Sequence, residues 1–457
     1  MEILRDLVNA FLGLGAAVFV PIIMIVAGLL VKMKPKDAIS AGLLLGIAFT
    51  GMSEVISFMR GAITPVAEAM VNSTGVELSI IDGGWTTMSV ISWSWPYAFL
   101  MFPLQIGINI IMLIIKKTKT FNADLWNVWG KIFTAVIVYG TTKSIILGFV
   151  VAAIQIVIEL WSSDAHAKRL QHLSGIPGVT CSHRTMFFSC ILWPFEMVLR
   201  KIPFLQKDYT ISTLRDKIGI FAENHVLGFI LGCVFGIVGK YSIPDILSLG
   251  LIAGTAMTLF PMVTKLFMQS LSPLSEAVQA YMQKKFADRE IYVGLDWPYL
   301  GGSNEIWIAV MAIVPMLVVY AFILPGNNLL PFAGVINLSL AVPAWNVTKG
   351  NIPRMLILCA IGAPIFLWVG TAIAPYMSDL AMQTGAVELG AGELISNSSI
   401  NAPVFTFGTQ LFSFLQGNFI PLVVMVVWGT CWFFYTRWLK KEDALLVNDE
   451  NVQAEMD

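Results

Sequence analysis

Long apolar runs are the feature that most constrains how this chain can fold. An α-helix needs about 20 apolar residues to cross a bilayer, and eleven segments of the sequence approach or exceed that length. Only 12% of the residues are charged, whereas soluble domains carry about 25%. These charged residues are too few to cover a water-facing surface. We therefore predict a polytopic membrane protein rather than a soluble enzyme, a nucleic-acid-binding protein or a disordered chain. The predicted spans are residues 12–31, 38–59, 96–115, 132–160, 186–199, 224–239, 245–270, 305–324, 330–346, 355–376 and 419–438.

The distribution of Lys and Arg predicts the orientation of the chain. Cytoplasmic loops of membrane proteins are enriched in these residues. If the N-terminus lies outside and the C-terminus in the cytoplasm, the inner segments hold 20 of the 28 Lys and Arg residues and the outer segments hold six. The first residues carry both charge signs and precede a long apolar run, so they do not resemble a secretory signal. We predict a multi-pass protein of the plasma membrane in this orientation.

Four further segments fit neither a span nor a simple loop, because they are moderately apolar and rich in Gly, Ser, Thr and Asn. They are residues 61–81, 162–185, 272–304 and 377–418. Residues 273–289 combine helical apolar spacing with a charged face, which predicts an amphipathic helix on the membrane surface. Polar backbone persists at membrane depth only where it is buried in protein or lines a wet cavity. We therefore predict re-entrant hairpins near 77–95 and 290–305.

The two halves of the sequence share landmarks at a nearly constant offset. Asp82 and Asp296 each precede an apolar span, and they lie 214 residues apart. Further matches at a similar offset are 12–31 with 224–239, 38–59 with 245–270, and 178–185 with 391–398. Because five spans separate the starts of the two halves, the second copy is expected to be inverted, as in many secondary transporters. We predict two inverted repeats and a C-terminal part that holds the final span and a cytoplasmic tail, with the boundaries 1–207, 208–400 and 401–457.

Six short motifs follow one another along nearly the whole chain. They are Gly84-Trp85 with Trp93, Asn122-Ala123-Asp124-Leu125-Trp126-Asn127-Val128-Trp129, Ser182-His183-Arg184-Thr185, Phe221-Ala222-Glu223, Gly294-Leu295-Asp296, and Pro325-Gly326-Asn327-Asn328-Leu329-Leu330-Pro331-Phe332. Each motif is weak by itself. Together and in this order they resemble the galactitol-family IIC component, the permease, of the bacterial phosphoenolpyruvate-dependent sugar phosphotransferase system. That family is related to the ascorbate-type IIC transporters.

The resemblance implies a scaffold domain, a mobile core domain, a homodimer and sugar movement by an elevator-like shift. It also implies that the IIC protein carries the polyol across the bacterial inner membrane. A separate IIB protein, which acts with IIA, phosphorylates the polyol from a phosphocysteine. The sequence departs from the family pattern at Ser182, where a Pro is expected, and at Ser303-Asn304-Glu305, where His-Thr-Ala is expected. The resemblance favours galactitol as the substrate. Because both departures lie where the substrate is expected, the exact polyol stays open.

A polyol site needs polar groups at membrane depth, because stripping water from a hydroxyl without replacement costs a few kcal/mol. Ionisable residues inside a membrane are costly and mark functional sites, and a Trp face suits the carbon chain. The candidate substrate-binding residues are Asp82, Trp85, Thr86, Tyr139, Lys143, His183, Thr185, Glu223, Asn224, Asp296, Ser303, Asn304 and Glu305. His183 or Asp296 could also orient or deprotonate the hydroxyl that is phosphorylated.

Several of these candidates also have a purely structural interpretation. Asp82 precedes Gly and could cap a turn, and Asp296 could act as a cap too. Glu223 and Glu305 could each complement the dipole of the helix that follows. Lys143 could extend its amine to the membrane surface. These alternatives stay open at the level of the sequence.

No cofactor or metal site is expected. The sequence has no dinucleotide-binding glycine motif, Walker lysine, HExxH, GxSxG or EF-hand loop. His183 lacks two nearby residues of metal-binding type. The alternative to a role of His183 in substrate binding is a place in a solvated outer loop. The net charge of −1 provides no basic patch for nucleic acid. The alternative function is an ion-coupled secondary transporter of a polar solute.

Overall fold

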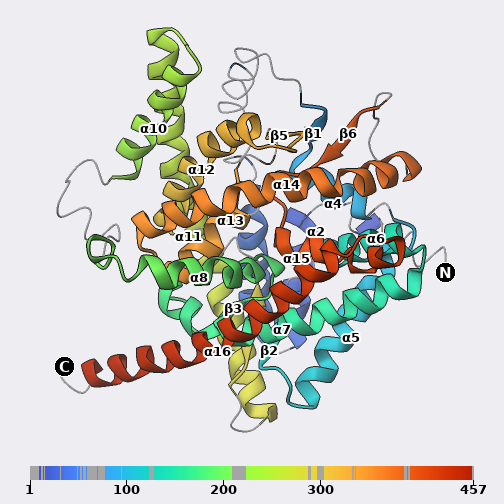
Figure 1. The fold of residues 1–457 in the computed structure, drawn as a ribbon. Helices are drawn as coiled ribbons and strands as arrows, with labels where there is room; N and C mark the ends of the chain where they lie inside the picture. Colours follow the sequence, from blue (N-terminus) through green and yellow to red (C-terminus); the bar gives the residue numbers. More distant parts are fainter. Residues whose placement is uncertain are drawn as a thin grey trace.

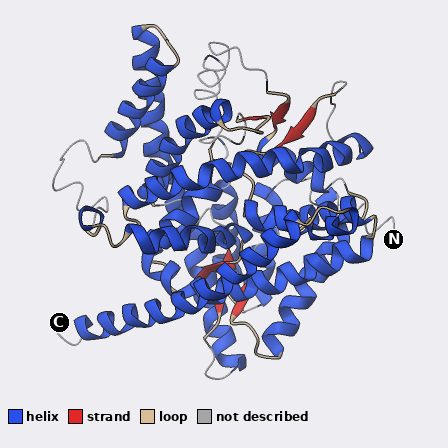
Figure 2. Ribbon diagram, viewed as in Figure 1, coloured by secondary structure: helices blue, strands red, loops and turns tan. Residues whose placement is uncertain are grey.

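Helices form most of the chain that the structure describes, and two small sheets lie among them (Figure 1). Figure 2 shows that the strands gather in two separate places. This computed structural model describes residues between 10 and 454. The longer stretches outside the description are residues 1–9, 59–68, 70–77, 123–127, 208–222, 287–289, 296–302, 385–388 and 455–457.

Several helices are long and apolar enough to cross a membrane. The four segments that meet this condition among the described residues are Ile145–Ser174, Asn304–Ile323, Ile352–Gln383 and Ile420–Asp443. They agree with a polytopic membrane protein, whereas the count of eleven spans stays a prediction. The helices are α2 (Ala16–Leu30), α4 (Gly84–Trp93), α5 (Met101–Ile114), α6 (Trp129–Thr142), α7 (Ile145–Ser174), α8 (Ser189–Leu199), α10 (Asn224–Val238), α11 (Ile243–Phe286), α12 (Asn304–Ile323), α13 (Leu338–Thr348), α14 (Ile352–Thr384), α15 (Pro403–Gly408) and α16 (Ile420–Ala454).

The segment predicted as one span at 132–160 consists of two helices, so that prediction is wrong. α6 ends before Lys143, whose left-handed φ of 56° cannot continue a helix. Ser144 then caps α7, because its hydroxyl accepts the N–H of Leu147 at 3.3 Å. Neither Lys143 nor Ser144 is a helix-breaking residue of the Gly or Pro type. Because apolar residues continue on both sides, the sequence predicted one helix instead of two.

The second half of α7 conflicts with the expected side of one segment. Residues 162–185 were expected as an outer segment, but α7 continues to Ser174. The Arg169 guanidinium pairs with Asp443 of α16 at 2.8 Å between Nη2 and Oδ1. Asp443 belongs to the part of the chain expected in the cytoplasm, so Arg169 lies at the same end of the molecule. The polar residues that suggested a loop are instead buried against protein.

α11 is longer than the bilayer is thick. Its 44 residues extend about 66 Å at the helical rise, whereas the hydrocarbon core measures about 30 Å. The span predicted at 245–270 and the amphipathic stretch at 273–289 therefore belong to one helix up to Phe286. The helix predicted over 273–289 is confirmed as far as Phe286, where it continues α11 through Pro273, and its place on the membrane surface stays a prediction.

In the described part of the chain, six short strands form two parallel three-stranded sheets. The strands are β1 (Ile80–Asp82), β2 (Thr120–Asn122), β3 (Val179–Cys181), β4 (Tyr292–Leu295), β5 (Leu329–Leu330) and β6 (Leu394–Ser396). The first sheet has the order β5-β1-β6 and the second β2-β4-β3. In each sheet, the central strand comes from one half of the sequence and both neighbours come from the other half. The all-α prediction missed these strands, because mostly buried strands of two to four residues show no alternating pattern.

The strands lie at the predicted hairpins. β1 and α4 occupy the segment near 77–95, and β4 and the start of α12 occupy the segment near 290–305. β1 pairs with β5 and β6, and β4 pairs with β2 and β3. These pairings bring the end of β1, which carries Asp82, and the end of β3, which precedes His183, next to strands from the other half of the chain.

Candidate functional site

The carboxylate of Asp82 joins the first hairpin to the loop that follows β6. Oδ1 accepts the N–H of Gly84 at 3.0 Å and the N–H of Ser398 at 3.1 Å. Oδ2 accepts the N–H of Gly334 at 2.9 Å and the hydroxyl of Ser398. The side chain is 2% exposed. These four donors use the acceptor positions of the carboxylate, which favours the turn-capping interpretation of Asp82 over direct contact with a ligand.

His183 begins a second buried group just after β3. Its Nδ1 accepts the N–H of Thr185 at 3.3 Å. The Thr185 hydroxyl donates to Oδ1 of Asn401 at 3.2 Å, and the Ser339 hydroxyl donates to the same oxygen. Each of these four residues is less than a tenth exposed. We call His183, Thr185, Ser339 and Asn401 the polar cluster.

The polar cluster presents two donors that do not satisfy each other. Because Nδ1 of His183 is an acceptor, the neutral ring carries its proton on Nε2. Nε2 lies 3.4 Å from the amide nitrogen of Asn401, which is also a donor. Burial, with the nearby charges of Lys131 and Arg184, holds the pKa of His183 well below its usual value. At neutral pH, the cluster can therefore offer two N–H groups to one hydroxyl oxygen.

The loop after β6 connects Asp82 with the polar cluster. Ser398 binds Asp82, and its carbonyl accepts the amide of Asn337 at 3.1 Å. Three residues later, Asn401 contacts His183 and Thr185. The repeat matched residues 391–398 to 178–185, and Asn401 lies three residues beyond that match. Asn401 was therefore not selected as a site residue, and no motif in the sequence marks it.

Some predicted site residues lie outside what the structure describes. Asp296 is one of them, and nothing is described of the side chains of Thr86 in α4 and Asn224 in α10. Trp85 is half-buried against the apolar core. Glu223 is half-buried directly before α10, a position that fits the helix-dipole alternative.

The remaining predicted residues lie on other elements than the polar cluster. Ser303 donates to the carboxylate of Glu305 in the first turn of α12, which begins at Asn304. A carboxylate at a helix N-terminus is stabilised by the helix dipole. At the end of α6, Nζ of Lys143 lies 5.8 Å from the centre of the Tyr139 ring. Their roles in substrate binding stay predictions.

One face of α7 is polar although it is buried. Gln155, Glu159, Ser163, His166 and Arg169 are each at most 2% exposed. Their spacing of three or four residues places them along one side of the helix. Two of these residues fall in the predicted span 132–160 and three in the predicted polar segment 162–185. The sequence therefore did not indicate the common face.

This face carries a buried ion pair with α6. Nζ of Lys131 lies 2.5 Å from Oε2 of Glu159, and both side chains are 1% exposed. Gln155 donates to the other carboxylate oxygen at 2.8 Å. Buried charges are costly unless they are paired. Lys131 and Glu159 therefore each need the other in order to stay buried and charged.

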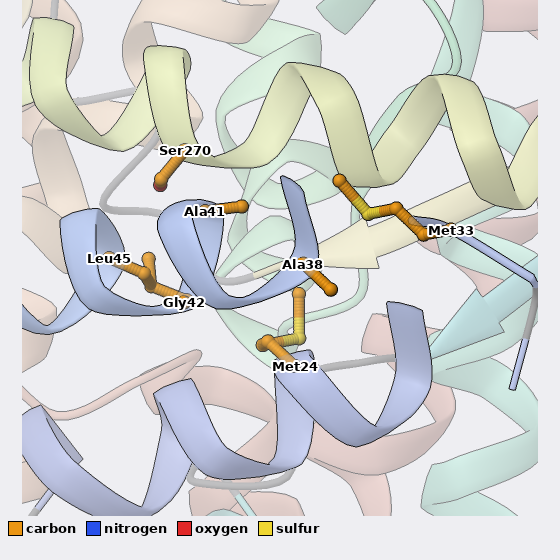
Figure 3. Close-up of a pocket in the computed structure, with 7 residues that line it drawn as sticks. All are labelled: Met24, Met33, Ala38, Ala41, Gly42, Leu45 and Ser270. Carbon is orange, nitrogen blue, oxygen red and sulfur yellow. The ribbon is translucent and has the colours of Figure 1, made fainter. Parts of the chain in front are cut away.

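The small gap in Figure 3 does not hold a polyol. Met24, Met33, Ala38, Ala41, Gly42, Leu45 and Ser270 surround it. Its volume of about 10 Å³ corresponds to roughly one water molecule. A larger cavity of about 400 Å³ lies between α10 and α11, lined mostly by apolar residues. Both cavities are lined by elements other than those of the polar cluster.

The sequence can now be compared with known protein families. The family model described as "PTS system sugar-specific permease component" (EIIC-GAT) matches residues 10–391. The chain belongs to this family. The match includes β1 to β5, the ion pair of α6 and α7, and His183. It confirms the resemblance that the sequence motifs indicated, and with the apolar helices it indicates a multi-pass protein of the inner membrane.

Curated relatives of this permease come from Escherichia coli. Proteins named "PTS system galactitol-specific EIIC component" from strain K12 and from O157:H7 are each 29% identical over 411 residues. The aligned part covers 89% of this chain and 91% of each relative. A "Putative permease IIC component" of strain K12 is 29% identical over 418 residues, which cover 91% of this chain and 95% of the relative.

Proposed function

We propose that this permease binds a sugar alcohol, with galactitol favoured, and carries it inward. Transport is coupled to phosphorylation by a separate IIB protein, which is supplied by IIA. The observation that carries this proposal is the polar cluster, where neutral donors and acceptors are buried at a contact between the two halves of the chain. The names of the galactitol-specific relatives supply the favoured substrate.

The chemistry of the polar cluster fits a neutral ligand with many hydroxyls. Each hydroxyl is both a donor and an acceptor, and the cluster offers imidazole, amide and hydroxyl groups. A charged solute would need a compensating charge in the cluster itself. The imidazole of His183 stays neutral at physiological pH. The polyol is therefore expected to contact His183 and Asn401, with Asp296 completing the site from the second hairpin.

The sheet topology supports two inverted repeats at 1–207 and 208–400, followed by 401–457. If the halves are exchanged, β5-β1-β6 becomes β2-β4-β3. Left-handed Lys residues recur at matching places as well: Lys32 with Lys240, and Lys143 with Lys349. A repeat of this kind supports a scaffold domain and a mobile core domain that move past each other as an elevator. We propose that the permease works in this way as a homodimer.

Three segments predicted on the inner side meet at one end of the molecule. Arg200 and Lys349 both pair with Glu442, at 3.2 Å in each case. They come from the segments 200–217 and 349–354 and from the C-terminal helix. This meeting supports one common side for the three segments, and their Lys and Arg content favours the cytoplasmic side.

The orientation can be tested by labelling. The Lys119 side chain is more than half exposed, so Lys119→Cys is expected to react with a membrane-impermeant maleimide only from the cytoplasmic side. A matched Cys at Lys349, on another predicted inner segment, should react from the same side. Labelling of Lys119→Cys in intact cells would contradict the proposed orientation.

The polar cluster predicts a loss of affinity in single variants. Asp296→Asn is expected to lower galactitol affinity about ten-fold or more, because a hydrogen bond to a charged group contributes about 1.5–3 kcal/mol and about 1.4 kcal/mol corresponds to one decade. His183→Ala is expected to have a similar effect, because a ligand hydroxyl left without its buried partner costs about 1–3 kcal/mol. The measurement is calorimetric titration of the purified protein. His172→Ala, which removes an exposed imidazole at the end of α7, is the control.

Thermal stability of the same variants separates binding from capping. A residue that only caps a turn lowers the unfolding temperature and leaves the affinity of the folded protein unchanged. If both variants bind galactitol as tightly as the unmodified protein, neither residue belongs to the site.

A further inference from the structure

Arg184 is buried deeply beside the polar cluster. It follows His183, begins the short helix Arg184–Phe188, and is 1% exposed. Its guanidinium lies 5.8 Å from the Trp129 ring centre and 5.2 Å from that of Phe133. The guanidinium therefore lies against two aromatic rings and away from solvent.

Only one nitrogen of this guanidinium is hydrogen-bonded within the described chain. Nη1 donates to the carbonyl of Gly130 at 3.0 Å and to the Thr134 hydroxyl at 3.4 Å. Nε and Nη2 are buried and have no acceptor among the residues that the structure describes. Buried donors without acceptors are costly and rare in folded proteins. This edge of Arg184 therefore needs an explanation that packing does not supply.

The nearby carboxylate of Glu159 is already engaged by other side chains and does not bind Arg184 in the described structure. Glu159 already binds Lys131 through Oε2 and Gln155 through Oε1. Among the side chains that the structure describes, Lys131 and Arg184 face this one carboxylate, and Glu159 makes its short contact with Lys131. A neutral polyol cannot compensate the charge of Arg184, whereas an anionic ligand can.

We propose that Arg184 binds the phosphoryl group of the phosphorylated polyol. This assignment rests on the proposed function, in which the permease acts on a polyol that becomes a phosphate ester. The Nε and Nη2 donors lie on one edge of the guanidinium, and this edge binds two oxygens of a phosphoryl group side by side. Arg184 is held next to the donors of His183 and Asn401. One ligand can thus place its hydroxyls on the polar cluster and its phosphoryl oxygens on Arg184.

The test is calorimetric titration of the purified protein with three probes: galactitol, galactitol monophosphate and inorganic phosphate. Arg184→Gln is expected to lower the affinity for the monophosphate, relative to galactitol, by about ten-fold or more. Arg184→Lys keeps the charge but loses the paired donors, so its loss should be intermediate. Arg200→Gln, which removes a half-exposed Arg from a pair with Glu442, is the control and should leave the ratio unchanged.

Thermal unfolding distinguishes the alternative role of Arg184. If Arg184 instead pairs with a carboxylate such as Asp124 or Asp296, Arg184→Gln leaves a buried charge unpaired and lowers the unfolding temperature. Arg184→Lys keeps a positive charge for such a carboxylate, so a pairing role predicts that Arg184→Lys restores the unfolding temperature and that neither variant changes the ratio of affinities. An unchanged ratio of affinities in Arg184→Gln would overturn the proposal.

The inorganic phosphate probe separates this proposal from the choice of substrate. If the unmodified protein binds no galactitol, the proposed substrate is wrong. Binding of inorganic phosphate that disappears in Arg184→Gln still supports the phosphoryl site in that case. Phosphate binding that Arg184→Gln leaves intact contradicts it.

Discussion

Lys131→Met is expected to destabilise the permease by about 3–5 kcal/mol. The substitution leaves the carboxylate of Glu159 buried without its cation, and breaking one side of a buried ion pair has a cost of this size. Both side chains are 1% exposed and their charged atoms are 2.5 Å apart, so water cannot replace the lost partner. Chemical unfolding in detergent micelles, followed by tryptophan fluorescence, measures the change.

The double variant Lys131→Met/Glu159→Met is the matched control. Replacing a whole buried pair by apolar residues of similar volume is often neutral or stabilising. We expect the double variant to recover most of the stability lost by Lys131→Met. If the double variant is less stable than the single one, the two residues contribute separately and not as a pair.

Asp82→Asn is expected to lower the stability by about 2–4 kcal/mol. Four described groups donate hydrogen bonds to the carboxylate of Asp82, and an Asn places an NH₂ group against some of these donors. At least one buried backbone N–H then loses its acceptor, which costs about 1–3 kcal/mol, and the other bonds lose their charge assistance. Because these bonds tie the first hairpin to the loop after β6, transport should fall as well. Thermal unfolding and uptake in vesicles measure the two effects.

Two further variants calibrate this result. Asp37→Asn changes an exposed carboxylate and should leave stability within about 0.5 kcal/mol. Ser398→Ala removes one of the four donors and should cost less than Asp82→Asn. Unchanged stability in Asp82→Asn, combined with loss of galactitol affinity, would show that Asp82 contacts the substrate and does not merely hold the hairpin.

The class of the protein could be predicted from the sequence because bilayer-crossing helices impose a simple pattern. Apolar runs and low charge indicated a polytopic membrane protein. The turn residues near Asp82 and Asp296 predicted re-entrant hairpins at two segments where the structure has short strands, and the re-entrant path itself stays a prediction. The break between α6 and α7 could not be predicted, because Lys143 takes a left-handed conformation that its residue type does not announce. The strands of the hairpins were missed because they are too short for a pattern.

The candidate site was predictable in part for a related reason. His183 and Thr185 stand in a motif and were selected, whereas Asn401 and Ser339 stand in ordinary Ser- and Asn-containing segments. Only the chain topology brings Asn401 to Thr185, 216 residues earlier in the sequence. Arg184 was part of the same motif, but its proposed role in phosphoryl binding rests on Nε and Nη2. The described residues supply no acceptor for these two nitrogens, and a sequence does not reveal this.

The central claim is transport coupled to phosphorylation, and uptake in membrane vesicles tests it most directly. Vesicles that contain the permease are given labelled galactitol with and without phosphoenolpyruvate and the soluble phosphotransferase proteins. We expect label to accumulate as the phosphate ester only when all of these components are present. Accumulation of free, unphosphorylated galactitol driven by a proton or sodium gradient would contradict the account and indicate an ion-coupled transporter.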